Sequence, residues 1–131
     1  MERNRHSALL QGTRILIIED EFLIAMELER LLADAGAETI CPCRTVEDAL
    51  LATENNSFSA AILDFCIGQQ IVTPVAHRLA SRGVPFIFYT AQTVEDTIRS
   101  EWPTCQIISK PAHSQDILNA IASLAIRDTS L

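Results

Sequence analysis

The feature that most constrains this chain is the run RILIIEDE at residues 14–21. Its four consecutive apolar residues are typical of a strand buried on both faces, as in a parallel sheet. Three acidic residues follow at once, and residues 22–36 then have the apolar spacing of a helix that ends at Gly36. Because α/β proteins place their chemistry at the carboxyl ends of such strands, we expect Asp20, with Glu19, to hold a divalent cation there.

The same order of strand and helix recurs five times along the chain. Strands are predicted at 14–18, 38–43, 60–64, 85–90 and 105–109. A helix follows each strand, and the last four helices begin near the capping residues Thr45, Thr73, Thr93 and Ser114. Residues 65–72 have neither period and contain Gly68, so they are predicted to be a loop. This (βα)5 pattern predicts an α/β fold in three layers, a five-stranded parallel sheet with helices on both faces.

Length and charge limit the function classes that remain. A chain of 131 residues fits one domain, which we place at residues 14–127, with a flexible leader at 1–13 and a tail at 128–131. A net charge of −7 argues against binding to nucleic acid, which needs a basic surface. No apolar run approaches the length of a membrane span, and no signal peptide is present, so we expect a cytoplasmic protein without a membrane partner.

The four cysteines do not have the spacing of a zinc site or a redox pair. We interpret them as small buried side chains in a reducing compartment, which would make them structural rather than reactive. Only Cys66, which lies near the predicted site, is a candidate for redox behaviour.

Residues that could take part in binding or catalysis stand at the carboxyl ends of four of the five predicted strands. They are Glu19 and Asp20, Asp64, Thr90, and Lys110. In a parallel sheet these strand ends share one edge, so the side chains are expected to converge. Clustered carboxylates suit Mg²⁺, and a lysine and a hydroxyl beside them suit phosphoryl oxygens. A carboxylate can also be the nucleophile and become an aspartyl phosphate.

Each of these residues also has an ordinary structural explanation when taken alone. Asp64 could cap a turn, Thr90 could bond to the backbone at a strand end, and a Lys-Pro pair is common in loops. For Glu21 we prefer such an explanation, since acids favour the first turn of a helix. The combination of four residue sets, each at the end of its own strand, is what makes the pattern specific.

The segments Ile17–Glu21, Ala61–Asp64, Tyr89–Ala91 and Lys110-Pro111 resemble those of the receiver domains of two-component response regulators. The resemblance covers about residues 14–127 and implies the flavodoxin-like strand order 2-1-3-4-5. It implies further that Asp64 accepts a phosphoryl group from a sensor histidine kinase or a histidine phosphotransfer protein. Glu19, Asp20, Asp64 and the backbone carbonyl of Cys66 would bind Mg²⁺, and Thr90 and Lys110 would bind the phosphoryl oxygens. The Lys110-Pro111 bond is often cis in this family.

The chain departs from the family pattern in two places. Residues 65–70, FCIGQQ, replace the usual Met-Pro and Gly after the phospho-acceptor. Ile107 stands three positions before the lysine, where the family has an aromatic residue that couples the hydroxyl of Thr90 to the surface. Cys66 and Gln92 occupy positions that tune dephosphorylation in the family.

These observations predict a single-domain response regulator that signals by contact with an unknown downstream protein, or acts as a phosphoryl shuttle or sink. It would catalyse only its own phosphorylation and dephosphorylation. Two alternatives stay open: a pseudo-receiver that binds partners without phosphorylation, and a small phosphatase with Asp64 as nucleophile. The phosphatase would need a second acid two residues after Asp64, where Cys66 stands. A flavin-binding protein is disfavoured because Glu-Asp-Glu replaces the loop that would bind phosphate.

Overall fold

The computed structural model describes residues 9–126, in which five parallel strands form the central sheet. The strands are β1 (Arg14–Ile18), β2 (Thr39–Cys43), β3 (Ala60–Leu63), β6 (Phe86–Thr90) and β7 (Ile107–Ser109). Their spatial order is β2-β1-β3-β6-β7, and every neighbouring pair is parallel. Counted along the chain without the small separate hairpin β4–β5, this is the expected order 2-1-3-4-5.

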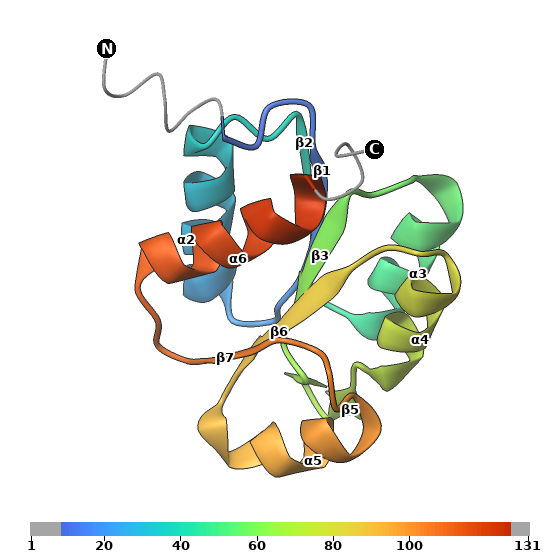
Figure 1. The fold of residues 1–131 in the computed structure, drawn as a ribbon. Coiled ribbons are helices and arrows are strands. Elements are labelled where there is room, and N and C mark those ends of the chain that lie inside the picture. The colour runs from blue at the N-terminus through green and yellow to red at the C-terminus, as the bar shows by residue number, and fades with distance from the viewer. Residues whose placement is uncertain (1–8, 127–131) are drawn as a thin grey trace.

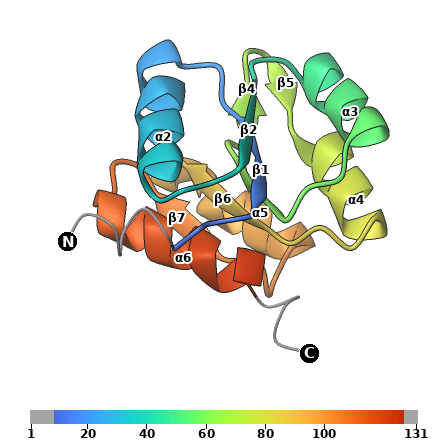
Figure 2. The same ribbon diagram turned by 90° about the horizontal axis from the view of Figure 1, so that it is seen from above.

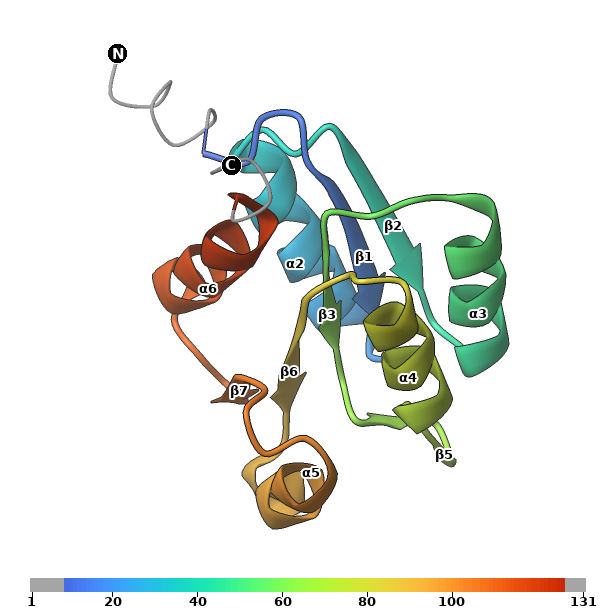
Figure 3. The ribbon, with the colours of Figure 1, turned by 45° about the vertical axis from the view of Figure 1, so that its right-hand side comes forward.

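Helices cover both faces of the sheet and complete the three layers (Figure 1). The helices are α2 (Phe22–Asp34), α3 (Val46–Asn55), α4 (Thr73–Ser81), α5 (Glu95–Glu101) and α6 (Ser114–Ile126). Seen from above, α2 and α6 lie on one side of the sheet, and α3 and α4 lie on the other (Figure 2). Ile98 of α5 belongs to the same apolar cluster as the residues of α3 and α4, so α5 closes the lower part of that second face (Figure 3).

The strand β1 separates two apolar cores because its side chains alternate between the two faces. Ile15 and Ile17 belong to the core under α2 and α6, whereas Leu16 and Ile18 belong to the core under α3 and α4. All four are completely buried. This is the burial expected of the central strand of a parallel sheet, and it explains why the run has no polar break.

Three local predictions differ from the structure. Residues 65–72 contain a short antiparallel hairpin of β4 (Cys66–Ile67) and β5 (Gln70–Ile71), with Gly68 at φ +61° in its turn. Helix α4 begins at Thr73 with Val72 as its N-cap, so Thr73 is the first helical residue rather than the cap. A 3₁₀ turn, η1 (Gln92–Val94), precedes α5, and no side-chain cap forms there. The predicted cap at Thr45 is confirmed, since its hydroxyl accepts the N–H of Asp48 at 3.0 Å.

Packing of the chain begins before Arg14, where the sequence suggested a leader. Leu10 is completely buried in the core under α2 and α6, and its N–H donates to the carbonyl of Ala35 at 2.8 Å. Gln11 forms an isolated bridge with Ala37. Residues 1–8 of the expected leader and the expected tail at 128–131 lie outside the described residues. None of the helices within residues 9–126 has the length and apolar character that crossing a membrane requires.

Replacing Leu10 by Ala should lower the free energy of unfolding by about 2–4 kcal/mol, because it leaves a cavity in the core. Leu9→Ala is the matched control, because Leu9 is 37% exposed and its truncation should cost less than about 0.5 kcal/mol. Urea denaturation of both variants measures the difference. Equal effects of the two substitutions would mean that residue 10 does not belong to the folded domain.

Candidate functional site

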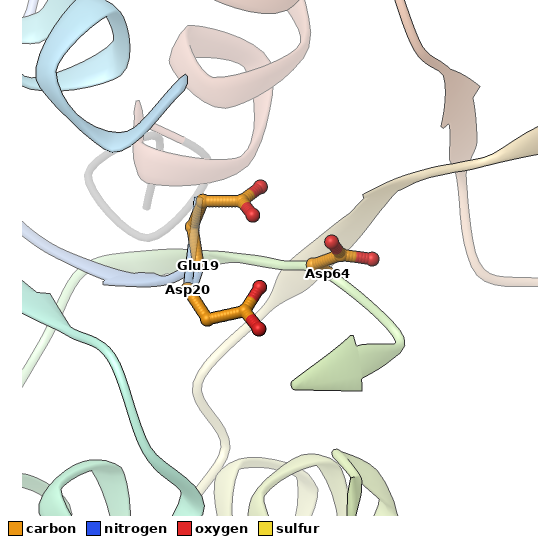
Figure 4. A group of neighbouring side chains, drawn as sticks. All are labelled: Glu19, Asp20 and Asp64. Atoms are coloured by element: carbon orange, nitrogen blue, oxygen red, sulfur yellow. The ribbon is translucent and has the colours of Figure 1, made fainter. Parts of the chain in front are cut away.

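Three carboxylates converge where β1 and β3 end (Figure 4). Glu19 and Asp20 follow β1, Asp64 follows β3, and one oxygen from each lies within 4.8 Å of the others. Glu19 and Asp64 are buried, whereas Asp20 is partly exposed. The sheet brings them together because Ile18 pairs with Leu63, so the next residues of both strands emerge side by side. The predicted convergence of these residues is therefore confirmed.

The backbone near the acids is held by the sheet that precedes them. The N–H of Glu19 donates to the carbonyl of Cys43 at 3.0 Å, and the N–H of Asp64 donates to the carbonyl of Ile18 at 2.9 Å. These bonds continue the ladder beyond the last residues of the strands. The carboxylates thus stand on backbone that the sheet makes rigid, which is a requirement for a precise binding site.

Lys110 brings a positive charge into the acidic cluster from the turn after β7. Its ammonium nitrogen lies 2.7 Å from Oδ2 of Asp64, 2.9 Å from Oε1 of Glu19 and 3.4 Å from Oε2 of Glu21. Its backbone N–H donates to the carbonyl of Thr90 at 2.9 Å. The Lys110-Pro111 peptide bond is cis, as the resemblance implied.

Thr90 engages the other oxygen of Asp64. Its hydroxyl donates to Oδ1 of Asp64 at 2.6 Å, and Thr90 is itself buried at the end of β6. Both oxygens of Asp64 therefore have a donor in the described structure, one hydroxyl and one ammonium. Asp64, Thr90 and Lys110 come from three different strand ends, and the structure places them in direct contact as the sequence predicted.

The pKa values of both Glu19 and Lys110 are raised, which favours the neutral form of the acid and the charged form of the lysine. Burial raises the pKa of Glu19 above its ordinary value, although its bond with Lys110 opposes this shift. Burial alone would lower the pKa of Lys110, but its hydrogen bonds and charge interactions with Asp64 and Glu19 outweigh that effect and raise it. Lys110 is therefore a permanent cation at neutral pH, and it compensates part of the acidic charge.

The donor set fits a hard divalent cation. Three carboxylates provide only oxygen ligands, and their mutual repulsion would be relieved by a cation with two charges. One oxygen of Asp20, Oδ2, already accepts the N–H of Gly68 in the β4–β5 hairpin at 2.7 Å. A ligand role for the backbone carbonyl of Cys66 stays a prediction.

Sequence reasoning missed the roles of several neighbouring residues. Glu21 is the N-cap residue of α2, at the helix end where the sequence placed it, but its side chain makes no capping bond and also contacts Lys110, which the sequence did not indicate. Gly68 lay in a segment without periodicity, and nothing in its sequence pointed to Asp20. Arg44 donates to the backbone carbonyl of Asp20 at 3.2 Å, and its guanidinium carbon lies 5.9 Å from the centre of the Phe22 ring.

A row of aromatic rings leads from Phe65, next to Asp64, to Trp102 at the C-terminal end of α5. Phe65 packs against Phe88 with ring centres 6.1 Å apart, Phe88 against Phe86 at 5.5 Å, and Phe86 against Trp102 at 5.4 Å. Trp102 is partly buried and also contacts His77 at 5.0 Å. Ile107, which replaces the usual aromatic residue, is partly buried against the same core.

Of the four thiols, those of Cys43 and Cys105 lie in surroundings that suppress reactivity. Cys43 is buried, and Cys41 and Cys105 are partly buried. Burial raises the pKa of Cys43 to about 12 and that of Cys105 to about 11, so these two are protonated at neutral pH. Cys66 is exposed on β4, in contrast to the prediction that all four are small buried side chains.

Known proteins with a related sequence are regulators of bacterial signalling. The phyllosphere-induced regulator PhyR of Methylorubrum extorquens is 34% identical over 129 residues, which are 95% of this chain. The chain spans about half of that relative's length, 48%. No protein-family model matches the chain.

Solved structures with the same fold include one of nearly the same length. SdrG from Sphingomonas melonis Fr1 is 38% identical, with 86% of this chain and 95% of that chain covered and a TM-score of 0.74. The response regulator PhyR from Brucella abortus is 26% identical over 95% of this chain and 52% of that chain, with a TM-score of 0.79. The receiver domain of the sensor histidine kinase PA1611 from Pseudomonas aeruginosa PAO1 is 17% identical, with a TM-score of 0.75 over 87% and 98% of the two chains, and has a magnesium ion coordinated in its active-site cleft.

Addition of Mg²⁺ should stabilise the protein, because the cation relieves repulsion among Glu19, Asp20 and Asp64. At ten times its dissociation constant the gain would be about 1.4 kcal/mol, a rise in Tm of roughly 4–6 °C. Asp20→Asn should remove most of this rise while keeping an oxygen that can accept from Gly68. Asp34→Asn, at the exposed end of α2, is the matched control and should leave the rise unchanged. Thermal unfolding with and without Mg²⁺ decides, and an equal rise in wild type and Asp20→Asn would contradict the predicted cation site.

Proposed function

Because this chain belongs to the receiver domains of two-component response regulators, we propose that it accepts a phosphoryl group on Asp64 in a Mg²⁺-dependent reaction. The donor would be the phosphohistidine of a sensor kinase or of a phosphotransfer protein. The observation that carries the proposal is the contact of Asp64 with Thr90 at 2.6 Å and with Lys110 at 2.7 Å, beside two further acids. A nucleophile, two donors for phosphoryl oxygens and a cation site thus meet at one edge of the sheet.

The chemistry is a transfer between two covalent bonds. An oxygen of Asp64 forms a bond to phosphorus, the phosphorus–nitrogen bond of the donor breaks, and the nitrogen keeps the electron pair. Each oxygen of Asp64 accepts one hydrogen bond, from Thr90 or from Lys110, so a second lone pair on the attacking oxygen remains for the new bond. Bound Mg²⁺, held by Glu19, Asp20 and Asp64, would supply positive charge for the phosphoryl oxygens. The magnesium ion in the receiver domain of PA1611 supports this assignment.

Phosphorylation would change the acceptor groups at Asp64 to which Lys110 and Thr90 donate. An acyl phosphate adds negative charge and acceptor oxygens at Asp64, so the ammonium and the hydroxyl would turn toward the new group. Thr90 lies directly before the exposed loop at Ala91 and η1, and its movement would shift the equilibrium position of α5. The signal would then leave by contact with a partner protein near α5 and β7, or the domain would serve as a phosphoryl shuttle or sink.

A partner that donates the phosphoryl group needs a surface next to Asp64. Phe22 and Leu23 in the first turn of α2 are 60% and 67% exposed, and Met26 one turn later is 45% exposed. Large apolar side chains that remain exposed together are typical of protein contact sites. Their place beside Glu21 and the acidic cluster supports docking of the kinase or phosphotransfer protein at this end of α2.

Two alternatives make different predictions about chemistry. A pseudo-receiver would bind partners without becoming phosphorylated, although it would have no need for the Asp64–Lys110–Thr90 contacts. A phosphatase acting on an external substrate would need an acid to protonate the leaving group, and the exposed thiol of Cys66 occupies that place. We therefore propose that the domain catalyses only its own phosphorylation and dephosphorylation, in the cytoplasm.

Incubation with the phosphodonor phosphoramidate should add one phosphoryl group per chain in the presence of Mg²⁺ and none in EDTA. Asp64→Asn should lose the adduct, because the amide cannot form the acyl phosphate. Asp96→Asn on α5 is the matched control and should be modified as the wild type is. Intact-mass spectrometry measures all four conditions.

The outcomes separate the alternatives. An adduct that persists in Asp64→Asn would contradict the assignment of the acceptor. A wild type that binds Mg²⁺ but gives no adduct with either phosphoramidate or acetyl phosphate would favour the pseudo-receiver. Continued release of inorganic phosphate from p-nitrophenyl phosphate, without loss of activity, would favour the phosphatase.

A further inference from the structure

The only lysine of the sequence lies against its only tyrosine. The ammonium of Lys110 is 5.8 Å from the centre of the Tyr89 ring, within the range of a cation–π interaction. The hydroxyl of Tyr89 accepts the backbone N–H of Ala112 at 3.4 Å. Tyr89 is only 7% exposed, so one buried side chain contacts the turn 110–112 at both ends, at the ammonium of Lys110 and at the backbone of Ala112.

We propose that Tyr89 is a positioning residue for phosphoryl transfer, because it holds the ammonium of Lys110 and the turn that carries it beside Asp64. The inference rests on the proposed function, since it assigns a role in that same reaction. Tyr89 does not touch the phosphoryl group and acts only through Lys110.

The geometry of the strands explains why Tyr89 can do this. Tyr89 of β6 pairs with Ile108 of β7, and the next pair, Thr90 with Ser109, leads directly into Lys110. Side chains alternate along a strand, so Tyr89 faces the core under α2 and α6 while its neighbour Thr90 bonds to Asp64. The ring therefore lies under the turn that follows β7, and the hydroxyl reaches the backbone beyond Pro111.

A lysine needs such support because its side chain is long and flexible. Holding it in one position costs conformational entropy, which a fixed neighbouring surface reduces. In the unphosphorylated structure three carboxylates, those of Glu19, Glu21 and Asp64, also attract the ammonium. Asp64 changes its chemistry during the reaction, whereas the contact with Tyr89 does not. Tyr89 can thus keep the ammonium of Lys110 beside Asp64 while that ammonium turns from the carboxylate toward the acyl phosphate.

Two substitutions separate the contributions of the hydroxyl and the ring. Tyr89→Phe removes only the acceptor for Ala112, and Tyr89→Leu also removes the ring under the ammonium. Ile87→Val, two residues earlier on the same face of β6, is the matched control for a general loosening of the core. The full chain is used in every case.

The first measurement is the rate of phosphorylation by phosphoramidate at saturating Mg²⁺. Tyr89→Phe should slow it about threefold and Tyr89→Leu about tenfold, in keeping with the strength of a buried cation–π contact. Ile87→Val should react at the wild-type rate.

The second measurement is nuclear magnetic resonance of protein labelled with ¹⁵N only in lysine, which gives the signal of Lys110 alone. The ammonium signal should be sharp in wild type and Ile87→Val, because the group is held and exchanges its protons slowly. It should broaden in Tyr89→Phe and more strongly in Tyr89→Leu. This signal reports on the ammonium in unphosphorylated protein, so it does not depend on the reaction.

An unchanged ammonium signal in both Tyr89 variants would overturn the proposal, whatever the rates. Slowing by Ile87→Val equal to that of Tyr89→Leu would also overturn it, since the effect would then be one of core packing. A wild type that is not phosphorylated at all would refute the proposed function, and the ammonium signals would still show whether Tyr89 holds Lys110.

Discussion

The ammonium of Lys110 is the charge on which the arrangement of the site depends. Glu19 and Asp64 are buried acids that lie close together, and without a positive charge between them their repulsion would favour protonation or displacement of one carboxylate. Lys110 reaches both at 2.7–2.9 Å. A cation at the acidic cluster would share this task, which would free the lysine for a new partner. Such an exchange of partners would suit the change in charge that the proposed phosphorylation brings to Asp64.

The parallel sheet fixes the relative positions of these charged side chains. Residues separated by 46 positions, Asp64 and Lys110, meet because parallel strands end at the same edge. The two apolar cores on either side of β1 fix the register of those strands, since a slip by one residue would exchange the side chains of the two cores. The contacts among the charged side chains therefore depend on the packing of the two apolar cores, because these cores set the strand register.

The sequence predicted those parts of the molecule that are marked by a run of apolar residues or by polar residues at the end of a strand. The buried run before Glu19 predicted the central strand, and the polar residues after the strands predicted the meeting of Asp20, Asp64, Thr90 and Lys110. It did not predict the hairpin of Cys66–Ile71, because two-residue strands carry no detectable period. Nor did it predict the contacts of Glu21 and Leu10, since these depend on which side chains from distant segments lie within reach after folding.

The aromatic contacts have a consequence for how the domain can be observed. Trp102 is the only tryptophan of the chain, and it lies at the end of a row of rings that begins at Phe65, the neighbour of Asp64. Its indole packs between β6 and His77 of α4, so its emission arises from a single place at the base of α5. Any displacement of α5 relative to β6 would alter the surroundings of that one fluorophore. The protein therefore contains its own optical probe, without a dye or an added label.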